Sequence, residues 1–248
     1  MSGHSKWASI KHKKRAVDAK RGKLFTKLAR AIQVAARDGG GDPDGNPALA
    51  LAIQKARDAS MPKDNIERAI AKGTGADADA EAFEDVTYEG YGPGGVAILV
   101  EALTDNRNRT SAEVRHAFTS RGGNLGEPGS VAWTFEKKGE LVLDAGRYGE
   151  DDLIAAIDAG AEDVSLDEDV WEVITEPADF AAVREALEGL ELQSAELVMR
   201  PKTTTPVDES DVGTLLRLIE DLEDHDDVQA VHANFDVDAA VLERVAAA

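Results

Sequence analysis

The sequence of 248 residues contains no cysteine. Disulfide bonds, thiolate metal ligands and thiol nucleophiles are therefore excluded, and the composition suits a reducing, cytoplasmic environment. No apolar run approaches the roughly 18 to 20 residues that a membrane-spanning helix requires, and the N-terminus lacks the apolar segment of a secretory signal. A mitochondrial transit peptide is also rich in arginine, but here the basic segment runs directly into a patterned helix. We expect a cytoplasmic protein without a membrane partner.

Catalytic motifs are absent as well. The five histidines show no metal-binding spacing such as His-Glu-x-x-His, and there is no Gly-x-Ser-x-Gly nucleophile motif. The glycine-rich segments GYGPGG and RGGNLGEPGS do not match the phosphate-loop consensus, and we interpret both as turns. With 48 Asp and Glu residues, some carboxylates lie near one another by chance, so their proximity predicts no active site. We expect no enzymatic activity, no metal site and no cofactor.

Acidic residues are almost missing from the first 37 positions, where eleven Lys and Arg accompany a single Asp. This segment, the basic head, carries a formal charge of +10 in a chain whose total is −20, so the other 211 residues carry −30. Clustered cations without acidic i,i+4 partners are typical of a phosphate-binding surface, because released counterions supply binding free energy. The alternative interpretation is an ordinary solvated helix face.

The basic head divides into two parts. Residues 5–20 are weakly periodic and predict an arm or a marginal helix that becomes ordered on binding. From Lys23 onward, Leu and Ile recur at three- and four-residue spacing, which predicts a helix that buries one face and presents cations beside it. Trp7 and the nearby histidines suit stacking on an exposed base, although a lone Trp also suits internal packing. The candidate nucleic-acid-binding residues of the basic head are Lys6, Trp7, Lys11, His12, Lys13, Lys14, Arg15, Lys20, Arg21, Lys23, Lys27 and Arg30.

A second candidate segment lies between a predicted strand and a predicted helix. Its residues are Asn106, Arg107, Asn108 and Arg109. Asn and Arg side chains can contact base edges or phosphates, but the same residues also suit a loop that caps a helix. The sequence leaves both possibilities open. Immediately afterwards, Thr-x-x-Glu from Thr110 matches a capping box, which predicts that the helix begins there.

The first 73 residues predict an all-helical domain. Asn46 followed by Pro47 indicates the start of one helix, and Pro62 indicates the start of another that ends at Gly73. The short acidic segment 74–82 is interpreted as a linker.

The rest of the chain predicts two α/β units. Two strands and a helix lead to a third strand, predicted where Val131, Trp133 and Phe135 alternate. The elements that follow have the order βαββαβ, which is typical of the ferredoxin-like arrangement. A later helix and strand, followed by a short closing helix, would complete the first unit. We therefore predict an α+β fold with an N-terminal all-helical domain and two ferredoxin-like α/β sandwich domains, one inserted into the other. The predicted domains are 1–73, 83–138 plus 201–248, and the inserted 139–200.

Three long segments resemble one family. They are MSGHSKWASIKHKKRAVDAKRGKLFTKLARAI, NPALALAIQKARDASMPKDNIERAIAKG and YEGYGPGGVAILVEALTDNRNRTSAEVRHAF. They closely resemble the YebC/PmpR family, which also includes the mitochondrial translational activator of cytochrome oxidase subunit one. The resemblance extends from Met1 into the last helix and is weakest over residues 140–200. It implies a crescent of three domains: the helical one and two α/β domains, one inserted in the other.

The resemblance implies two functions. One is a DNA-binding transcriptional regulator, and the other is a ribosome-associated translation factor that eases synthesis through proline-rich stretches. The outward row of the predicted helix suits phosphates better than base edges, and the acidic remainder would be repelled by flanking duplex DNA. From these considerations we favour ribosomal RNA, with DNA as the alternative ligand, and basic ribosomal proteins as further partners. We expect the chain to act as a monomer.

Overall fold

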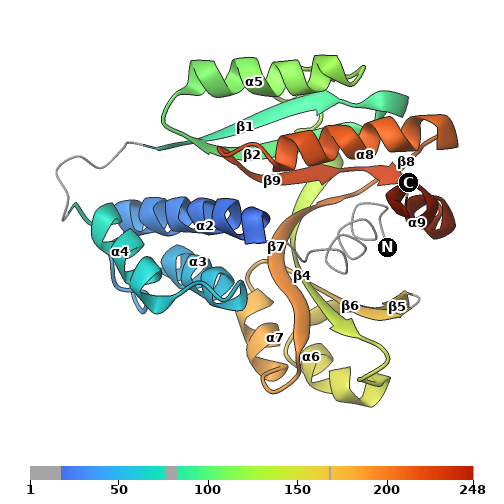
Figure 1. The fold of residues 1–248 in the computed structure, drawn as a ribbon. Helices are drawn as coiled ribbons and strands as arrows, with labels where there is room; N and C mark the ends of the chain where they lie inside the picture. Colours follow the sequence, from blue (N-terminus) through green and yellow to red (C-terminus); the bar gives the residue numbers. More distant parts are fainter. Residues whose placement is uncertain (1–17, 76–82, 168, 248) are drawn as a thin grey trace.

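The computed structural model describes residues 18–75, 83–167 and 169–247. Figure 1 shows a group of helices beside two four-stranded antiparallel sheets. The mixed architecture with a helical N-terminal part confirms the predicted α+β class. The arm predicted ahead of residue 18 lies outside the described residues. Within the described residues, no helix is both long enough and apolar enough to cross a membrane.

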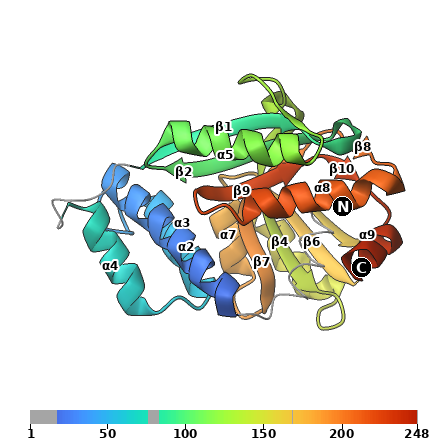
Figure 2. The ribbon, with the colours of Figure 1, turned by 45° about the horizontal axis from the view of Figure 1, so that its top comes forward.

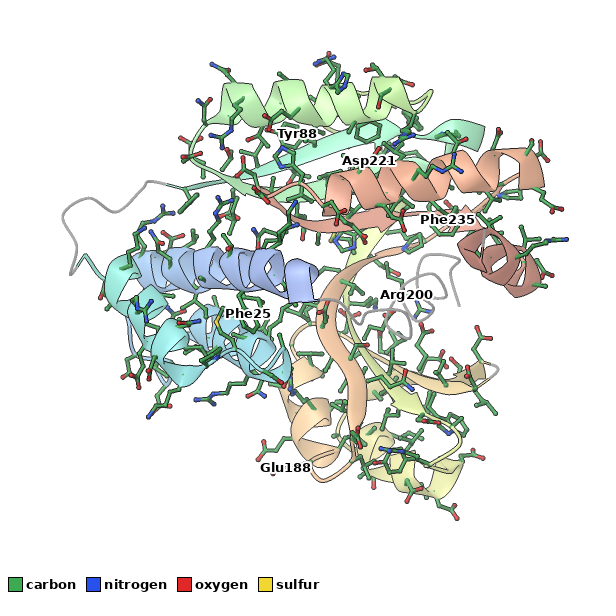
Figure 3. All side chains as sticks on the ribbon, viewed as in Figure 1. Phe25, Tyr88, Glu188, Arg200, Asp221 and Phe235 are labelled. Carbon is green, nitrogen blue, oxygen red and sulfur yellow. The ribbon has the colours of Figure 1, made fainter. Side chains whose placement is uncertain are left out.

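Three helices form the N-terminal part of the described chain. They are α2 (Asp18–Gly39), α3 (Pro47–Asp58) and α4 (Lys63–Gly73). The predicted start of α3 is confirmed, because the Asn46 side chain accepts the N–H of Leu49 at 3.1 Å and Pro47 occupies the first turn. Figure 3 shows Phe25 between α2 and the neighbouring helices, where it packs against their shared core. The buried members of that core include Leu28, Ile32, Leu49, Ile53 and Ile66.

The first sheet has the strand order β3-β1-β2-β9. Its strands are β1 (Glu84–Tyr91), β2 (Ala97–Thr104), β3 (Asn124–Leu125) and β9 (Val228–Ala233). Helices α5 (Arg107–Ser120) and α8 (Glu209–Glu223) lie side by side over one face (Figure 2). Phe118, Leu215 and Ile219 from these helices pack against Ile98 and Val100 of β2, and all five side chains are fully buried. This cluster is the main core of the unit.

The opposite face of the first sheet receives other parts of the chain. Near one end of β2, Leu103 packs with Phe83 and with Val34 of α2. Further along the strand, Leu99 packs with Val131 and other residues that precede and begin the second sheet. Both faces of β2 are thus covered, which explains why this strand is a nearly continuous apolar run.

The second sheet has the strand order β5-β6-β4-β7. Its strands are β4 (Phe135–Asp144), β5 (Ala161–Asp167), β6 (Val170–Thr175) and β7 (Leu192–Pro201). The helices α6 (Ile154–Asp158) and α7 (Phe180–Ala186) contribute to its core. The first and last strands of the unit are neighbours, as the predicted ferredoxin-like order requires.

All four strands of the second sheet lie between β3 and β9 in the sequence. The pairing of β4 with β7 begins at Phe135 opposite Pro201. The second sheet therefore starts four residues before the boundary predicted at residue 139. The division of the chain into three domains, one inserted into another, stays a prediction.

The strand predicted over Val131, Trp133 and Phe135 is wrong. The chain forms a 3-10 turn, η2 (Ala132–Thr134), before β4 begins, and the third strand of the first sheet is instead β3. The side chain of Glu89 accepts the N–H groups of Val131 and Ala132 at 2.7 and 2.8 Å. These bonds hold the backbone in a turn although the apolar residues alternate as they do in a strand.

Short elements complete the fold. They are the 3-10 turns η1 (Pro93–Gly95) and η3 (Glu150–Leu153), the parallel pair β8 (Thr205–Pro206) and β10 (Phe235–Asp236), and the helix α9 (Ala239–Ala247). The closing helix agrees with the sequence-based prediction, and the last predicted strand is divided into β9 and β10.

Candidate nucleic-acid interface

The described residues include only part of the predicted basic surface. Seven of its members lie outside them, and their binding role stays a prediction: Lys6, Trp7, Lys11, His12, Lys13, Lys14 and Arg15. Lys20 and Arg21 lie in the N-terminal part of α2, where only the backbone is described. The structure therefore bears mainly on Lys23, Lys27, Arg30 and the segment 106–109.

Three cations of α2 contact the C-terminal end of α8 and the turn after it. Lys23 donates to the main-chain oxygen of Asp224 at 3.1 Å, and Lys27 donates to that of Glu223 at 2.5 Å. Arg30 donates to the main-chain oxygen of Asp226 at 2.8 Å. Carbonyl groups at a helix C-terminus carry partial negative charge and lack partners within the helix, so cations stabilise them. Figure 1 shows α8 ending above α2 in that view.

This arrangement differs from the cation row that periodicity predicted at the helix surface. The charges of Lys27 and Arg30 are directed at another part of the same chain, and the Arg30 side chain is 22% exposed. Lys23 keeps more open surface, with 55% of its side chain exposed. The stripe beside the buried face of α2 thus serves to attach the helix to the first sheet unit, and its contact with phosphates stays a prediction.

Asp227 lies at the centre of this attachment. Its side chain is 2% exposed and accepts from Arg30 of α2 at 2.7 Å and from Arg109 of α5 at 2.8 Å. The hydroxyl groups of Thr110 and Thr104 donate to the same carboxylate at 2.7 and 3.3 Å. One carboxylate therefore joins α2, the end of β2, the start of α5 and the turn before β9.

The charge of Asp227 is stabilised by these donors. Burial alone would raise its pKa, but the bonds from Arg109, Thr110 and Arg30 outweigh that effect and lower the pKa to about 2. The bond to Asp227 is also the main reason why the pKa of Arg109 is raised, with Asp105 contributing as well. Arg30 further lies over the ring of Phe83, with its guanidinium carbon 5.1 Å from the ring centre.

Asn106 caps α5, so the helix begins earlier than predicted. The Asn106 side chain accepts the N–H of Arg109 at 3.1 Å, and α5 starts at Arg107. The capping box predicted at Thr110 is wrong, because Thr110 is inside the helix, fully buried, and bonded to Asp227. Glu113 is the other residue of that predicted box, and its Oε2 instead lies 2.6 Å from Nε2 of His225.

The four residues of the segment 106–109 therefore have different surroundings. Asn106 and Arg109 are engaged in capping α5 and in binding Asp227. Arg107 and Asn108 are exposed, and among the described residues their side chains have no hydrogen bond or ion pair. They extend from the first turn of α5, where backbone N–H groups also favour an anion. Arg107 and Asn108 are the members of this segment best placed to contact a phosphate.

Sequence reasoning did not single out Asp227. It lies in the run Asp224-His225-Asp226-Asp227, which resembles many other acidic stretches in a chain with 48 Asp and Glu residues. The signal that could have identified it is that four side chains share Asp227 as a partner: those of Arg30, Thr104, Arg109 and Thr110. That signal appears only when β2, α5 and α2 are placed together.

Metal binding has no geometric support in the described residues. Within them, no group of three or more His, Asp and Glu side chains is arranged to hold an ion.

Comparison with known proteins shows the family. The model of the TACO1/YebC protein N-terminal domain matches residues 5–76, and the model of the TACO1/YebC second and third domain matches residues 83–235. The chain belongs to the TACO1/YebC family. Both matched ranges agree with the resemblance predicted from the sequence, and together they include all the Lys and Arg residues of the basic head, the Asp227 attachment and α5.

Relatives in the TACO1/YebC family match nearly the full chain. A "Probable transcriptional regulatory protein" of Rubrobacter xylanophilus is 58% identical over 249 residues, covering 99% of this chain and 100% of the relative. One of the same name from Dictyoglomus turgidum is 55% identical over 247 residues, covering 98% and 99%. These names describe regulatory proteins rather than enzymes.

A solved structure has the same fold. The "Conserved Hypothetical Protein Aq1575" from Aquifex aeolicus superposes with a TM-score of 0.81 at 48% sequence identity, covering 90% of this chain and 93% of that one. This likeness supports the arrangement of the helical region and the two sheets described above.

Proposed function

We propose that this protein is a nucleic-acid-binding regulator of gene expression, and that it regulates transcription. The observation that carries the proposal is the basic head, which holds +10 in a chain of −20. The names of the family relatives support transcription as the process. Binding through such a head depends on neutralising phosphates, because displaced counterions gain entropy.

In this proposal the basic head supplies most of the affinity and α5 supplies a second contact. Arg107 and Asn108 extend from the first turn of α5, at the same end of the first sheet where Arg30 attaches α2. The attachment through Asp227 would hold α2, the helical part of the head, in a fixed orientation relative to α5. Nucleic acid would then contact both elements along one edge of the protein.

A second candidate is regulation of translation by binding ribosomal RNA, easing synthesis through proline-rich stretches. Two observations favour it. The 211 residues outside the head carry −30, which would be repelled by long flanking duplexes, and the cations of α2 contact α8 rather than forming a free helix face for a major groove. In that case a single copy of the chain would place its acidic sheets toward basic ribosomal proteins.

One experiment separates these candidates. The purified protein is mixed with fragmented genomic DNA and, separately, with ribosomes at the same moderate salt concentration. Recovery of discrete DNA sites would support transcriptional regulation, whereas ribosome co-sedimentation without DNA site preference would support the second candidate. Binding to neither at low salt would overturn the proposal as a whole.

The role of the head is tested by charge reversal. Changing Lys11, Lys13 and Lys14 to Glu should abolish binding to whichever nucleic acid the first experiment identifies. The matched control reverses three exposed cations of the helical region outside the head, Arg57, Lys63 and Arg68, and so makes the same change in net charge. Equal loss of binding in both variants would indicate a general charge effect and contradict the assignment to the head.

A further inference from the structure

Trp133 is an exposed aromatic side chain on a fixed turn. It lies in η2 and is 68% exposed, more than the other exposed large hydrophobic residues of the described chain. Its indole Nε1 donates to the main-chain oxygen of Ser130 at 3.1 Å. Because the polar edge of the ring already has a partner within the turn, the ring faces are the part left for a ligand.

The turn beneath Trp133 is held by a buried carboxylate. Glu89 is 7% exposed, and its oxygens accept the N–H groups of Gly129, Val131 and Ala132 at 2.7, 2.7 and 2.8 Å. Burial would raise the pKa of Glu89, but these three donors outweigh it and lower the pKa. A charged carboxylate with three backbone donors fixes the turn strongly, so the ring does not need to be ordered when a ligand arrives.

A cation is bonded to the backbone of the same turn. The backbone N–H of Lys202 donates to Thr134 at 2.8 Å, and its ammonium group donates to the main-chain oxygen of Trp133 at 3.2 Å. Two chain segments that are far apart in the sequence thus place an exposed aromatic ring and a positive charge on one turn. This is the combination with which proteins hold unpaired nucleotides, since the base stacks and the backbone phosphate is attracted.

From this geometry we infer that Trp133 is a stacking site for an unpaired base of a nucleic acid, with Lys202 beside it for the adjoining phosphate. The inference deepens the proposed function and depends on it. A protein partner fits less well, because the other exposed large hydrophobic residues are not next to Trp133. Trp133 precedes the first residue of β4, whereas Ile154, Ile157 and Leu166 lie in α6 and β5, which come after its last residue. A lone ring suits one flat ligand better than an extended protein interface.

The site is separate from the α5 contact. Trp133 is anchored through Glu89, near the end of β1 where Tyr91 pairs with Ala97, whereas Arg107 follows the end of β2 where Thr104 pairs with Glu84. The rise per residue along a strand puts these two ends roughly 20 Å apart. A strand of several nucleotides would be needed to contact both, so short and long oligonucleotides should respond differently.

The test uses the full chain and mixed-sequence single-stranded RNA and DNA oligonucleotides of about 16 nucleotides, with affinity measured by fluorescence anisotropy. Trp133→Ala should weaken binding about tenfold, which is typical for loss of one stacked base. Trp133→Phe keeps an aromatic face and should stay within about threefold of wild type. The matched control is Leu166→Ala, which removes a residue of 55% exposure at a distance from the turn and should leave affinity unchanged.

An oligonucleotide with abasic sites separates stacking from other effects. If the ring stacks on a base, wild type and Trp133→Ala should bind the abasic strand equally. A tenfold difference that persists on the abasic strand would overturn the inference, as would equal affinity of wild type and Trp133→Ala for the normal strand. If the wild-type protein binds neither oligonucleotides, genomic DNA nor ribosomes, the proposed function itself has failed; binding without a Trp133 effect refutes the stacking site alone.

Discussion

At the residue scale, the most informative side chain is Asp227. Its carboxylate accepts hydrogen bonds from two guanidinium groups and two hydroxyl groups, which come from three separate parts of the chain. A buried ion pair is weak evidence for net stability, because desolvation offsets the attraction. Removing one partner is a different matter, since it leaves the other charges without compensation. Asp227 is therefore best understood as fixing the position of α2 and α5.

We expect Asp227→Asn to lower the free energy of unfolding by about 2 to 4 kcal/mol, because the half-buried Arg30 and the more exposed Arg109 both lose their buried counter-charge. Urea denaturation at pH 7 measures the change. The control is Asp221→Asn on α8, labelled in Figure 3, whose partner Arg121 lies 2.7 Å away in a more exposed pair. That control should cost less than about 1 kcal/mol, and similar losses in both variants would contradict the special role of Asp227.

The pH dependence follows from the lowered pKa. The pKa of Asp227 is about 2 in the folded protein, below the ordinary value of 3.8. Its ionised form is therefore favoured by folding, so its contribution is present above about pH 4 and is lost as the pH falls toward 2. The stability difference between wild type and Asp227→Asn should shrink by roughly 2 kcal/mol over that range. A difference that does not change with pH would show that the carboxylate charge is not responsible.

At the element scale, the sequence predicts most helices and strands but not every boundary. The three- and four-residue spacing of apolar residues predicted α2, start and stop residues predicted α3 and α4, and the βαββαβ order predicted the second sheet. The predicted start of α5 was wrong because Asn106 caps the helix and Thr110 is instead buried against Asp227. The predicted strand over 131–135 was wrong because the buried carboxylate of Glu89, more than forty positions earlier, holds the backbone in a turn. Local patterns carry no information about such partners.

The cap of α5 gives a prediction at this scale. Asn106→Ala should reduce stability by about 1 kcal/mol, because the side chain accepts the N–H of Arg109 at the start of the helix. Asn106→Asp preserves the acceptor and should keep most of the stability. Thermal unfolding measures both variants, and nucleic-acid affinity is measured in parallel. If Asn106 acts only as a cap, Asn106→Ala should leave the affinity of the folded protein unchanged; a specific loss would restore it as a binding residue.

At the scale of the whole molecule, charge is distributed along the chain in an unusual way. The basic head carries +10, and the remaining 211 residues carry −30. The sequence predicted this polarity fully, since it depends on counting alone. It could not predict that α2 would direct Lys23, Lys27 and Arg30 toward α8, because that contact joins positions about two hundred residues apart. The candidate interface therefore has two parts. The cations before α2 are predicted to contact phosphates, whereas Lys23, Lys27 and Arg30 bind another part of the same chain.

Salt dependence tests this division. A head that neutralises six to ten phosphates should lose about 10³ to 10⁵ in affinity between 50 and 200 mM salt. Reversing Lys11, Lys13 and Lys14 should flatten the slope of log affinity against log salt by about 2 to 3, if weak binding remains measurable at the lowest salt. Titrations by anisotropy at four salt concentrations give the slope, with the Arg57, Lys63 and Arg68 reversal as the comparison. An unchanged slope would show that these lysines do not contact phosphates.

The contact between α2 and the end of α8 has a consequence for the order of events during synthesis. Lys23 and Asp224 are separated by 201 positions in the chain. At ordinary rates of translation, about 10 to 40 s pass between the appearance of one and the other. During that interval the helical region can fold around its own core, but the main-chain oxygens that Lys23 and Arg30 contact after α8 have not yet been synthesised. A nascent chain of this protein would thus expose more positive charge than the finished one, next to the RNA of the ribosome that makes it.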